Sequence, residues 1–79
     1  MPHYLIRLIN SEFESWEEGD YASVEAALSS AIAAATEIAR EAVLRGEISS
    51  AVEIRVEDGD HVAGRRLVSL GVADLAPGG

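Results

Sequence analysis

Residues 24–45 read VEAALSSAIAAATEIAREAVLR, and this stretch sets the architecture of the 79-residue chain. Its apolar residues recur every three or four positions, which is the spacing of one face of an α-helix. The pattern predicts one long helix of about 33 Å, at ~1.5 Å per residue, which is long enough to cross a small sheet. The predicted apolar face consists of Val24, Leu28, Ala31, Ile32, Ala35, Ile38, Ala39 and Ala42.

The ends of this helix are marked by residues that satisfy backbone groups. Ser23 is the favoured N-cap because its hydroxyl can accept a hydrogen bond from a backbone N–H of the first turn, and Asp20 is the competing cap. Gly46 supplies the left-handed stop that commonly ends a helix. Arg45 stands four residues after Glu41, the favourable order for an ion pair on the last turn.

Two strands are predicted before the helix. Residues 3–9 carry apolar side chains on both faces, which indicates a strand inside the sheet. Asn10 and Ser11 form a predicted turn, and residues 12–16 alternate acidic or polar with aromatic side chains, as in a half-exposed hairpin partner. Residues 17–20, with the sequence Glu-Glu-Gly-Asp, are expected to end that strand.

The chain after the helix predicts a second hairpin. Residues 51–57 alternate strictly between apolar and charged side chains, which predicts a strand. Residues 58–59 form a turn signal, and residues 67–72 read as the returning strand. Glycines within and before that strand predict a wide loop or a bulge over residues 60–66. The core-facing side chains of residues 51–57 are predicted to be Val52, Ile54 and Val56.

These elements predict an α+β fold in the order β-β-α-β-β, a mostly antiparallel four-stranded sheet with the one long helix packed on one face. Residues 1–75 form a single domain and residues 76–79 a flexible tail. The first strand is expected inside the sheet, beside a strand of the second hairpin. The uncovered face would keep three apolar side chains and serve as a homodimer surface, namely Leu5, Ile9 and Leu67.

The charge of the chain limits its partners. The formal net charge is -8 and lysine is absent. Nucleic-acid binding needs clustered cations, so DNA and RNA are disfavoured as partners, whereas a basic protein partner is favoured. All six cationic residues are scattered arginines, at Arg7, Arg40, Arg45, Arg55, Arg65 and Arg66.

The sequence also gives no sign of a metal, a cofactor or a membrane. Cysteine is absent, so neither a disulfide nor a Cys/His zinc site can form. We therefore expect no metal site and no cofactor. The first apolar run, residues 4–9, is interrupted by Arg7 and is too short for a signal peptide or a membrane span. A cytoplasmic protein that does not bind membranes is the expectation.

Four short motifs carry a resemblance that covers nearly the whole chain: MPHY (1–4), EEG (17–19), SVEAA (23–27) and IRVEDG (54–59). They resemble a family of short uncharacterised bacterial proteins that is known only as a domain of unknown function. The resemblance implies a fold and a stand-alone bacterial protein, and it brings no activity. Residues 60–66 depart from the family because they form a longer connection than its tight turn.

The acidic segment before the helix is the principal candidate for a binding site. Its simplest interpretation is an edge strand that charge protects against aggregation. The alternative is a docking face for a basic partner, with Trp16 or Phe13 as the aromatic anchor. Trp16 itself is assigned to the core because a domain this small needs its largest side chain there. On the docking interpretation the binding residues are Glu12, Glu14, Trp16, Glu17, Glu18 and Asp20.

Signatures of catalysis are weak. After removal of Met1, Pro2 would resemble the N-terminal general base of small tautomerase-superfamily subunits, which also begin with a strand. Those subunits pass from the first strand to the helix without the hairpin inserted here, so an ordinary strand start is favoured. His3 and His61 lack a second histidine at metal spacing, and no serine lies in a nucleophile elbow. No catalytic residue is assigned.

Three functions follow as hypotheses. The leading one is a small non-enzymatic accessory or regulatory protein, a homodimer that acts through contacts with other proteins. The second is an acidic inhibitor that imitates nucleic acid and blocks a basic enzyme, suggested by the size and charge of the chain. The third is a tautomerase-like enzyme that uses Pro2.

Overall fold

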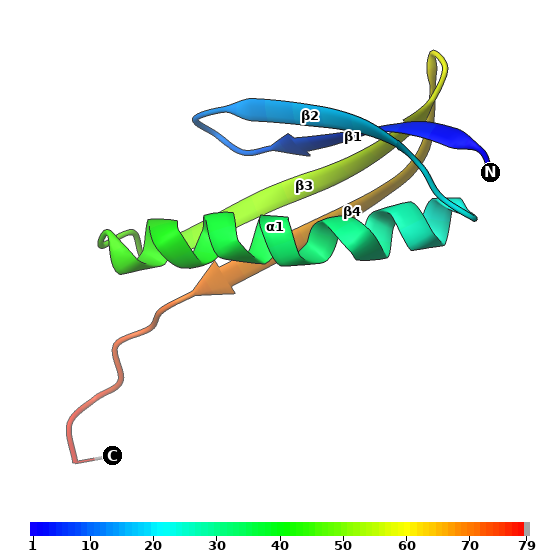
Figure 1. Ribbon diagram of the computed structural model, residues 1–79. Coiled ribbons are helices and arrows are strands. Elements are labelled where there is room, and N and C mark those ends of the chain that lie inside the picture. The colour runs from blue at the N-terminus through cyan, green and yellow to red at the C-terminus, as the bar shows by residue number, and fades with distance from the viewer. Residues whose placement is uncertain (79) are drawn as a thin grey trace.

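The computed structural model describes residues 1–78, which form one helix and four strands in the predicted order β-β-α-β-β (Figure 1). Val72 still donates a backbone hydrogen bond to the carbonyl oxygen of Ile48 at 2.8 Å, and residues 73–78 extend away from the sheet (Figure 1). Gly79, the last residue of the predicted tail, lies outside the described residues. The elements are β1 (His3–Ile9), β2 (Glu14–Asp20), α1 (Val24–Leu44), β3 (Ser49–Asp58) and β4 (His61–Gly71).

The four strands form one antiparallel sheet in the order β2-β1-β3-β4. β1 therefore lies inside the sheet, next to β3 of the second hairpin, as its apolar residues on both faces predicted. The junction between the two hairpins runs from the pairing of Leu5 with Glu57 to that of Ile9 with Glu53, with Arg7 opposite Arg55 at its middle. β2 and β4 are the edges of the sheet, so each has one side on which no strand of the described chain pairs with its backbone.

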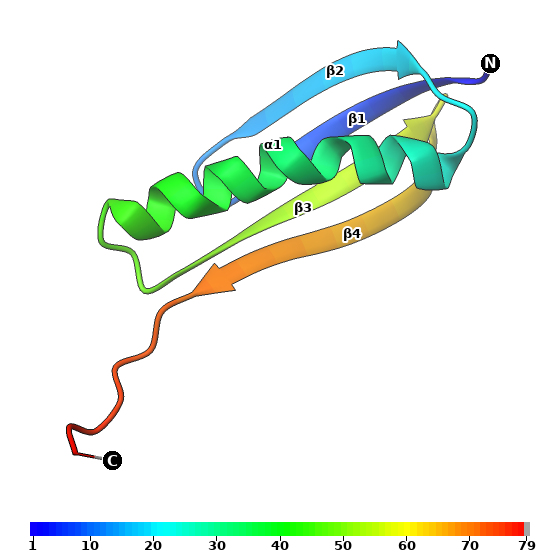
Figure 2. The same ribbon diagram turned by 60° about the horizontal axis from the view of Figure 1, so that its bottom comes forward.

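The helix α1 lies along one face of the sheet (Figure 2) and packs mainly against β3 and β4, with little contact to β1. A helix with its side chains is about 10 Å wide. Neighbouring strands are about 4.8 Å apart, so one helix covers about two strands. The three predicted core residues of β3 are fully buried, and Tyr4 and Ile6 of β1 join them. The buried residues of α1 are Ala27, Leu28, Ala31, Ala35, Ala39 and Ala42.

The start and stop signals of α1 act as predicted. The hydroxyl of Ser23 accepts a hydrogen bond from the backbone N–H of Ala26 at 3.1 Å, which confirms Ser23 as the N-cap. The competing cap, Asp20, lies in β2. Gly46 follows the helix with a φ of 108°, a left-handed conformation that favours glycine.

Two details of the predicted helix are wrong. Arg45 follows the last residue of α1, and its side chain pairs with Glu47, with Nη2 3.2 Å from Oε2, instead of with Glu41. The exposed turn after the helix brings Glu47 within reach of this guanidinium. Ile32, assigned to the apolar face, is 36% exposed because it lies on the flank of the helix and not against the sheet.

The strand β2 is longer at its end than the sequence predicts. Residues 17–20 were expected to end the strand, but they pair with β1, with Glu17 opposite Ile6 and Asp20 opposite His3. The Glu-Glu-Gly-Asp sequence has weak intrinsic preference for a strand, and pairing with a well-formed neighbour overrides it.

The strand β4 begins earlier than predicted. The wide loop expected over residues 60–66 is wrong, because these residues are almost entirely strand. The alternative expectation of a bulge is confirmed, since the pairing with β3 skips Ala63 between Val62 and Gly64. Val72, expected in this strand, follows its end and is exposed.

Candidate functional site

A tight turn between β1 and β2 holds the acidic segment in place. The side-chain oxygen Oδ1 of Asn10 accepts hydrogen bonds from the backbone N–H groups of Glu12 at 2.8 Å and Phe13 at 2.9 Å. The backbone N–H of Asn10 donates to the carbonyl oxygen of Phe13 at 3.0 Å. An asparagine side chain that accepts from the backbone two residues on stabilises an Asx-turn. The turn thereby sets β2 in register with β1 from Glu14 onward.

The strand β2 is an edge whose side chains are exposed on both faces. It lies outside the contacts of α1, and only Gly19 among its residues is half-buried. Successive side chains of a strand point to opposite faces. Ser15 and Glu17 pair with buried or half-buried β1 residues on the side of α1, whereas Glu12 belongs to the turn. The other face of β2 carries Glu14, Trp16, Glu18 and Asp20, so the predicted site is divided between two faces.

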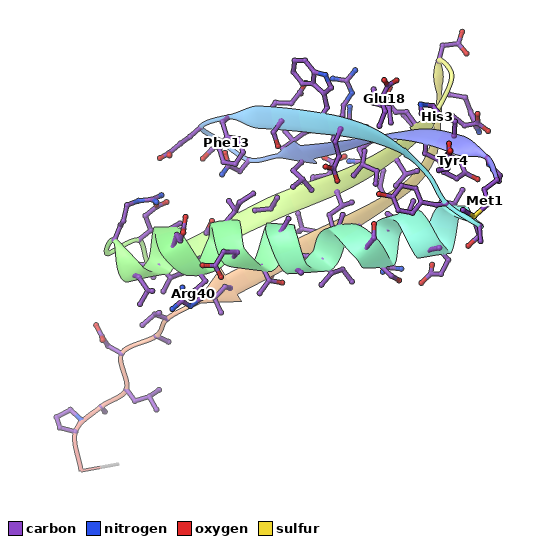
Figure 3. All side chains as sticks on the ribbon, in the orientation of Figure 1. Met1, His3, Tyr4, Phe13, Glu18 and Arg40 are labelled. Carbon is purple, nitrogen blue, oxygen red and sulfur yellow. The ribbon has the colours of Figure 1, made fainter. Side chains whose placement is uncertain are left out.

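The assignment of Trp16 to the core is wrong. Its side chain is 66% exposed, on the face opposite α1, in a cross-strand pair with Arg7. Because the helix covers β3 and β4, no second layer lies over β2 to receive the indole. Phe13 is also exposed, at the turn end of the hairpin, whereas His3 and Glu18 lie at the other end (Figure 3). Exposed aromatics of this kind serve as anchors in protein interfaces.

Three carboxylates of β2 have basic partners in β1, namely Arg7 and His3. Arg7 Nη1 lies 2.8 Å from Glu14 Oε2. His3 Nδ1 lies 2.9 Å from Asp20 Oδ1, and His3 Nε2 lies 3.6 Å from Glu18 Oε1 (Figure 3). The hydrogen bond to Asp20, and after it the negative charges of Asp20 and Glu18, raise the pKa of His3 above its ordinary value. Part of the negative charge on this face is therefore balanced locally, by Arg7 and, when it is protonated, by His3.

The two remaining acidic residues of the segment have no such partner. Glu12 and Glu17 form no salt bridge with any residue from 1 to 78. Glu17 also borders a groove of about 130 Å³ between α1 and the first hairpin, to which Ile6 and Leu8 of β1 contribute apolar surface. These carboxylates are free to meet a cation from outside the chain.

The sheet face opposite α1 carries a row of three arginines. The strand register places Arg7, Arg55 and Arg65 side by side on β1, β3 and β4, in line with the tryptophan of β2. The Nε groups of Arg55 and Arg65 both donate to Glu53 Oε2, at 3.0 and 2.8 Å, and Arg7 donates to Glu57. The hydrogen bonds from Arg65 and then Arg55 lower the pKa of Glu53. Sequence reasoning missed this network because it depends on the register of three strands.

The three apolar residues predicted for this face do lie on it, but charged groups separate them. Leu5 and Ile9 are half-buried, and Leu67 is 65% exposed. Glu57 pairs with Leu5, and Glu53 lies between Ile9 and Leu67. On this face salt-bridged groups separate the three apolar side chains. Such a surface offers little contiguous apolar area against which a second copy could pack.

The other sequence candidates lie apart from the acidic segment. Pro2 is exposed, which is not the desolvated setting that a neutral catalytic amine needs, and its carbonyl accepts a hydrogen bond from Tyr21 N–H at 3.0 Å. His61 is exposed where β4 begins. Within residues 1–78 no three His, Cys, Asp or Glu side chains are arranged to hold a metal ion. No helix of the described part has the length and apolar character needed to cross a membrane.

A sequence match to the family described as "Domain of unknown function (DUF6894)" covers residues 3–68, from the start of β1 into β4. The chain belongs to this family. The resemblance to a domain of unknown function, inferred from short motifs, is thereby confirmed. Comparisons with curated proteins and with solved structures found no match. The family description names no activity.

Proposed function

We propose that this protein is a non-enzymatic accessory or regulatory protein that binds a basic segment of another protein along β2. One observation carries the proposal: β2 is a free edge strand with carboxylates on both faces and a tryptophan, Trp16, that is 66% exposed. A free edge offers backbone groups to which an extended segment can add as a further strand. A cytoplasmic location, expected from the sequence, is part of the same proposal.

Charge complementarity determines the kind of segment that fits. β2 contains three glutamates and one aspartate and no cation, and its carboxylates lie on both faces. Alternate residues of a strand share one face, so Lys or Arg at alternate positions of an added strand would meet carboxylates on whichever face they occupy. The exposed indole can contact both apolar groups and cations. The same carboxylates disfavour pairing between β2 strands of two copies. Imitation of nucleic acid gains less support, because three of the carboxylates already have partners in β1.

The fluorescence of Trp16 tests the proposal directly, because it is the only tryptophan of the chain. Titration with a peptide of alternating lysine and valine is expected to give a saturable change in emission. It should also slow hydrogen exchange of β2 amides, because strand addition places them in new hydrogen bonds. A peptide of alternating glutamate and valine is the control and should cause neither change.

Two charge reversals separate a defined site from general attraction. Glu17→Lys removes a carboxylate of β2, whereas Asp60→Lys makes the same change of net charge in the exposed β3–β4 turn. Loss of a complementary charge at the binding edge should weaken the lysine–valine peptide about tenfold, and Asp60→Lys should have little effect. Equal weakening by both variants would mean that only net charge attracts the peptide, and the proposal would be wrong.

A further inference from the structure

The strand β4 is the second edge of the sheet, and its composition differs from that of β2. Its 11 residues include Arg65 and Arg66 but no Asp or Glu, in a chain with a net charge of -8. Both guanidinium groups are already bound, Arg65 to Glu53 and Arg66 to Glu25. Natural edge strands are kept from pairing by free charge, by proline or by cover. The outer edge of β4 has neither proline nor an unpaired acidic charge to protect it.

Apolar side chains are exposed along this unprotected edge. Leu67 is 65% exposed, and Val62 and Leu70 are exposed as well. Burying such groups is favourable in proportion to the apolar area removed from water. A partner strand along β4 would therefore gain both backbone hydrogen bonds and apolar contact.

The flank of α1 above this edge has matching features. Glu25 binds Arg66 Nη2 at 2.8 Å, which identifies the flank of the helix that faces β4. Ile32 lies two turns further along the same flank and is 36% exposed, and Ser29 and Thr36 beside it are small. Because α1 lies over β3 and β4, two copies joined along β4 would hold their helices about two strand spacings apart. That separation is about 10 Å, a usual distance for packed helices.

We infer that a second copy of this chain pairs with β4 in antiparallel orientation, so that two four-stranded sheets form one sheet of eight strands with both helices on the same face. In this register Leu67 lies opposite Leu67 of the other copy, and Arg65 lies opposite Ser69. Pairing centred on Arg66 would instead place two guanidinium groups opposite each other. A two-fold interface of this kind closes at the dimer. The inference goes beyond the proposed partner of β2 and does not depend on it.

The mass of the full chain in solution is the first test. Light scattering is expected to give 16.8 kDa, twice the 8.4 kDa of one chain. Leu67→Glu would place two carboxylates opposite each other and is expected to return the mass to 8.4 kDa with an unchanged helical circular-dichroism signal, because Leu67 is exposed in the single chain. Trp16→Glu changes an equally exposed side chain on the other edge and should leave the dimer intact.

A cross-link tests the register without depending on a disruptive variant. The chain has no cysteine, so Leu67→Cys introduces a single thiol. Cβ atoms of directly opposed residues lie about 5 Å apart, close enough for a disulfide with a small adjustment, and mild oxidation is expected to yield a linked dimer. Trp16→Cys should stay unlinked under the same conditions.

Three results would overturn the inference. The first is a mass of 8.4 kDa that persists up to millimolar concentration. The second is a mass that keeps growing beyond the dimer, since pairing of β4 with β2 of the next copy would be head-to-tail and would build filaments. The third is a dimer that survives Leu67→Glu and resists the Leu67→Cys cross-link, which would place the contact on another surface.

Discussion

The two edges of one sheet, β2 and β4, differ in what lies above them. β4 is covered on one face by α1, whereas β2 is covered on neither. β4 accordingly keeps apolar residues and carries cations that bind carboxylates of β3 and α1. β2 has carboxylates and polar groups on both faces, with the tryptophan as its one large apolar side chain. The uncovered edge is acidic and would suit a basic strand, whereas the covered edge has no acidic residue and could pair with a copy of itself.

The difference follows from the size of the single helix. The described chain has one helix, and one helix covers about two of the four strands. Contacts to β3 and β4 leave the outer half of the first hairpin as a single layer. The stability of β2 therefore comes from its pairing with β1 and from the Asn10 turn, and a ligand at β2 need not displace any packed element.

The largest expected effect on stability comes from adding one methyl group to β4, at Gly64. A Cβ at Gly64 of β4 would lie 2.7 Å from Val24 Cγ1 and 3.2 Å from Leu28 Cδ1 of α1. Valine is stiff at χ1, so the helix itself must move. Gly64→Ala is expected to lower the free energy of unfolding by about 2 kcal/mol, the usual cost of overpacking, as measured by urea denaturation at a fixed protein concentration.

Gly19→Ala in β2 is the matched control for this substitution. The three atoms nearest to its Cβ would all belong to the side chain of Tyr21, with Cε2 at 3.1 Å, and this half-buried side chain can rotate away. The expected loss is below about 1 kcal/mol, because alanine also reduces the freedom of the unfolded chain. If the two variants were equally destabilised, the helix would not be the element that distinguishes the edges.

The elements that the sequence predicts best are those that the helix covers. Strict alternation identified Val52, Ile54 and Val56 because β3 is central, with one face under α1 and the other in water. A strand that the helix does not cover is exposed on both faces, so its apolar and polar residues need not alternate. Residues 17–20 gave no strand signal because both faces of β2 are exposed, and only pairing with β1 makes them a strand. Residues 60–66 looked like a loop because the skipped residue, Ala63, shifts the phase of β4.

The candidate site was predictable in composition but not in arrangement. The acidic run is visible in the sequence, yet its division between two faces depends on where β2 begins. The tryptophan was assigned to the core from a general preference that holds only where a second layer exists. Arg7, Arg55 and Arg65 are separated widely along the chain, and only the register of β1, β3 and β4 brings them into one row. No local pattern signals such a row.

Removing a carboxylate from the sheet face opposite α1 should lower the free energy of unfolding by a smaller amount. The loss should again be larger near β4 than at β2. Glu53 accepts from Arg55 and Arg65 and is 20% exposed, whereas Glu14 pairs with Arg7 alone and is 43% exposed. Glu53→Gln is expected to destabilise the protein by about 1 kcal/mol at pH 7, and Glu14→Gln by about half of that or less, as measured by denaturation.

The pH dependence of the stability lost in Glu53→Gln tests whether the ion pairs of Glu53 cause it. The pKa of Glu53 is lowered in the folded protein, so its contribution is present above the ordinary carboxyl pKa of 4.5 and is lost as the pH falls through the lowered value. The wild type and Glu53→Gln should therefore converge in stability in acid. A difference that stays constant down to about pH 2 would show that the ion pairs are not responsible.

The smallest expected effect is a shift in the pKa of His3, which lies beside the acidic strand β2. Asp20, and after it Glu18, raise the pKa of His3 above its ordinary value of 6.5. A raised histidine pKa contributes stability below the ordinary value, and the contribution is lost as the pH rises through the folded pKa. Proton NMR of the imidazole should show the pKa falling in Asp20→Asn and falling less in Glu18→Gln, because Asp20 makes the hydrogen bond at 2.9 Å. Equal shifts in the two variants would indicate that diffuse negative charge along β2, and not this pair, holds the proton.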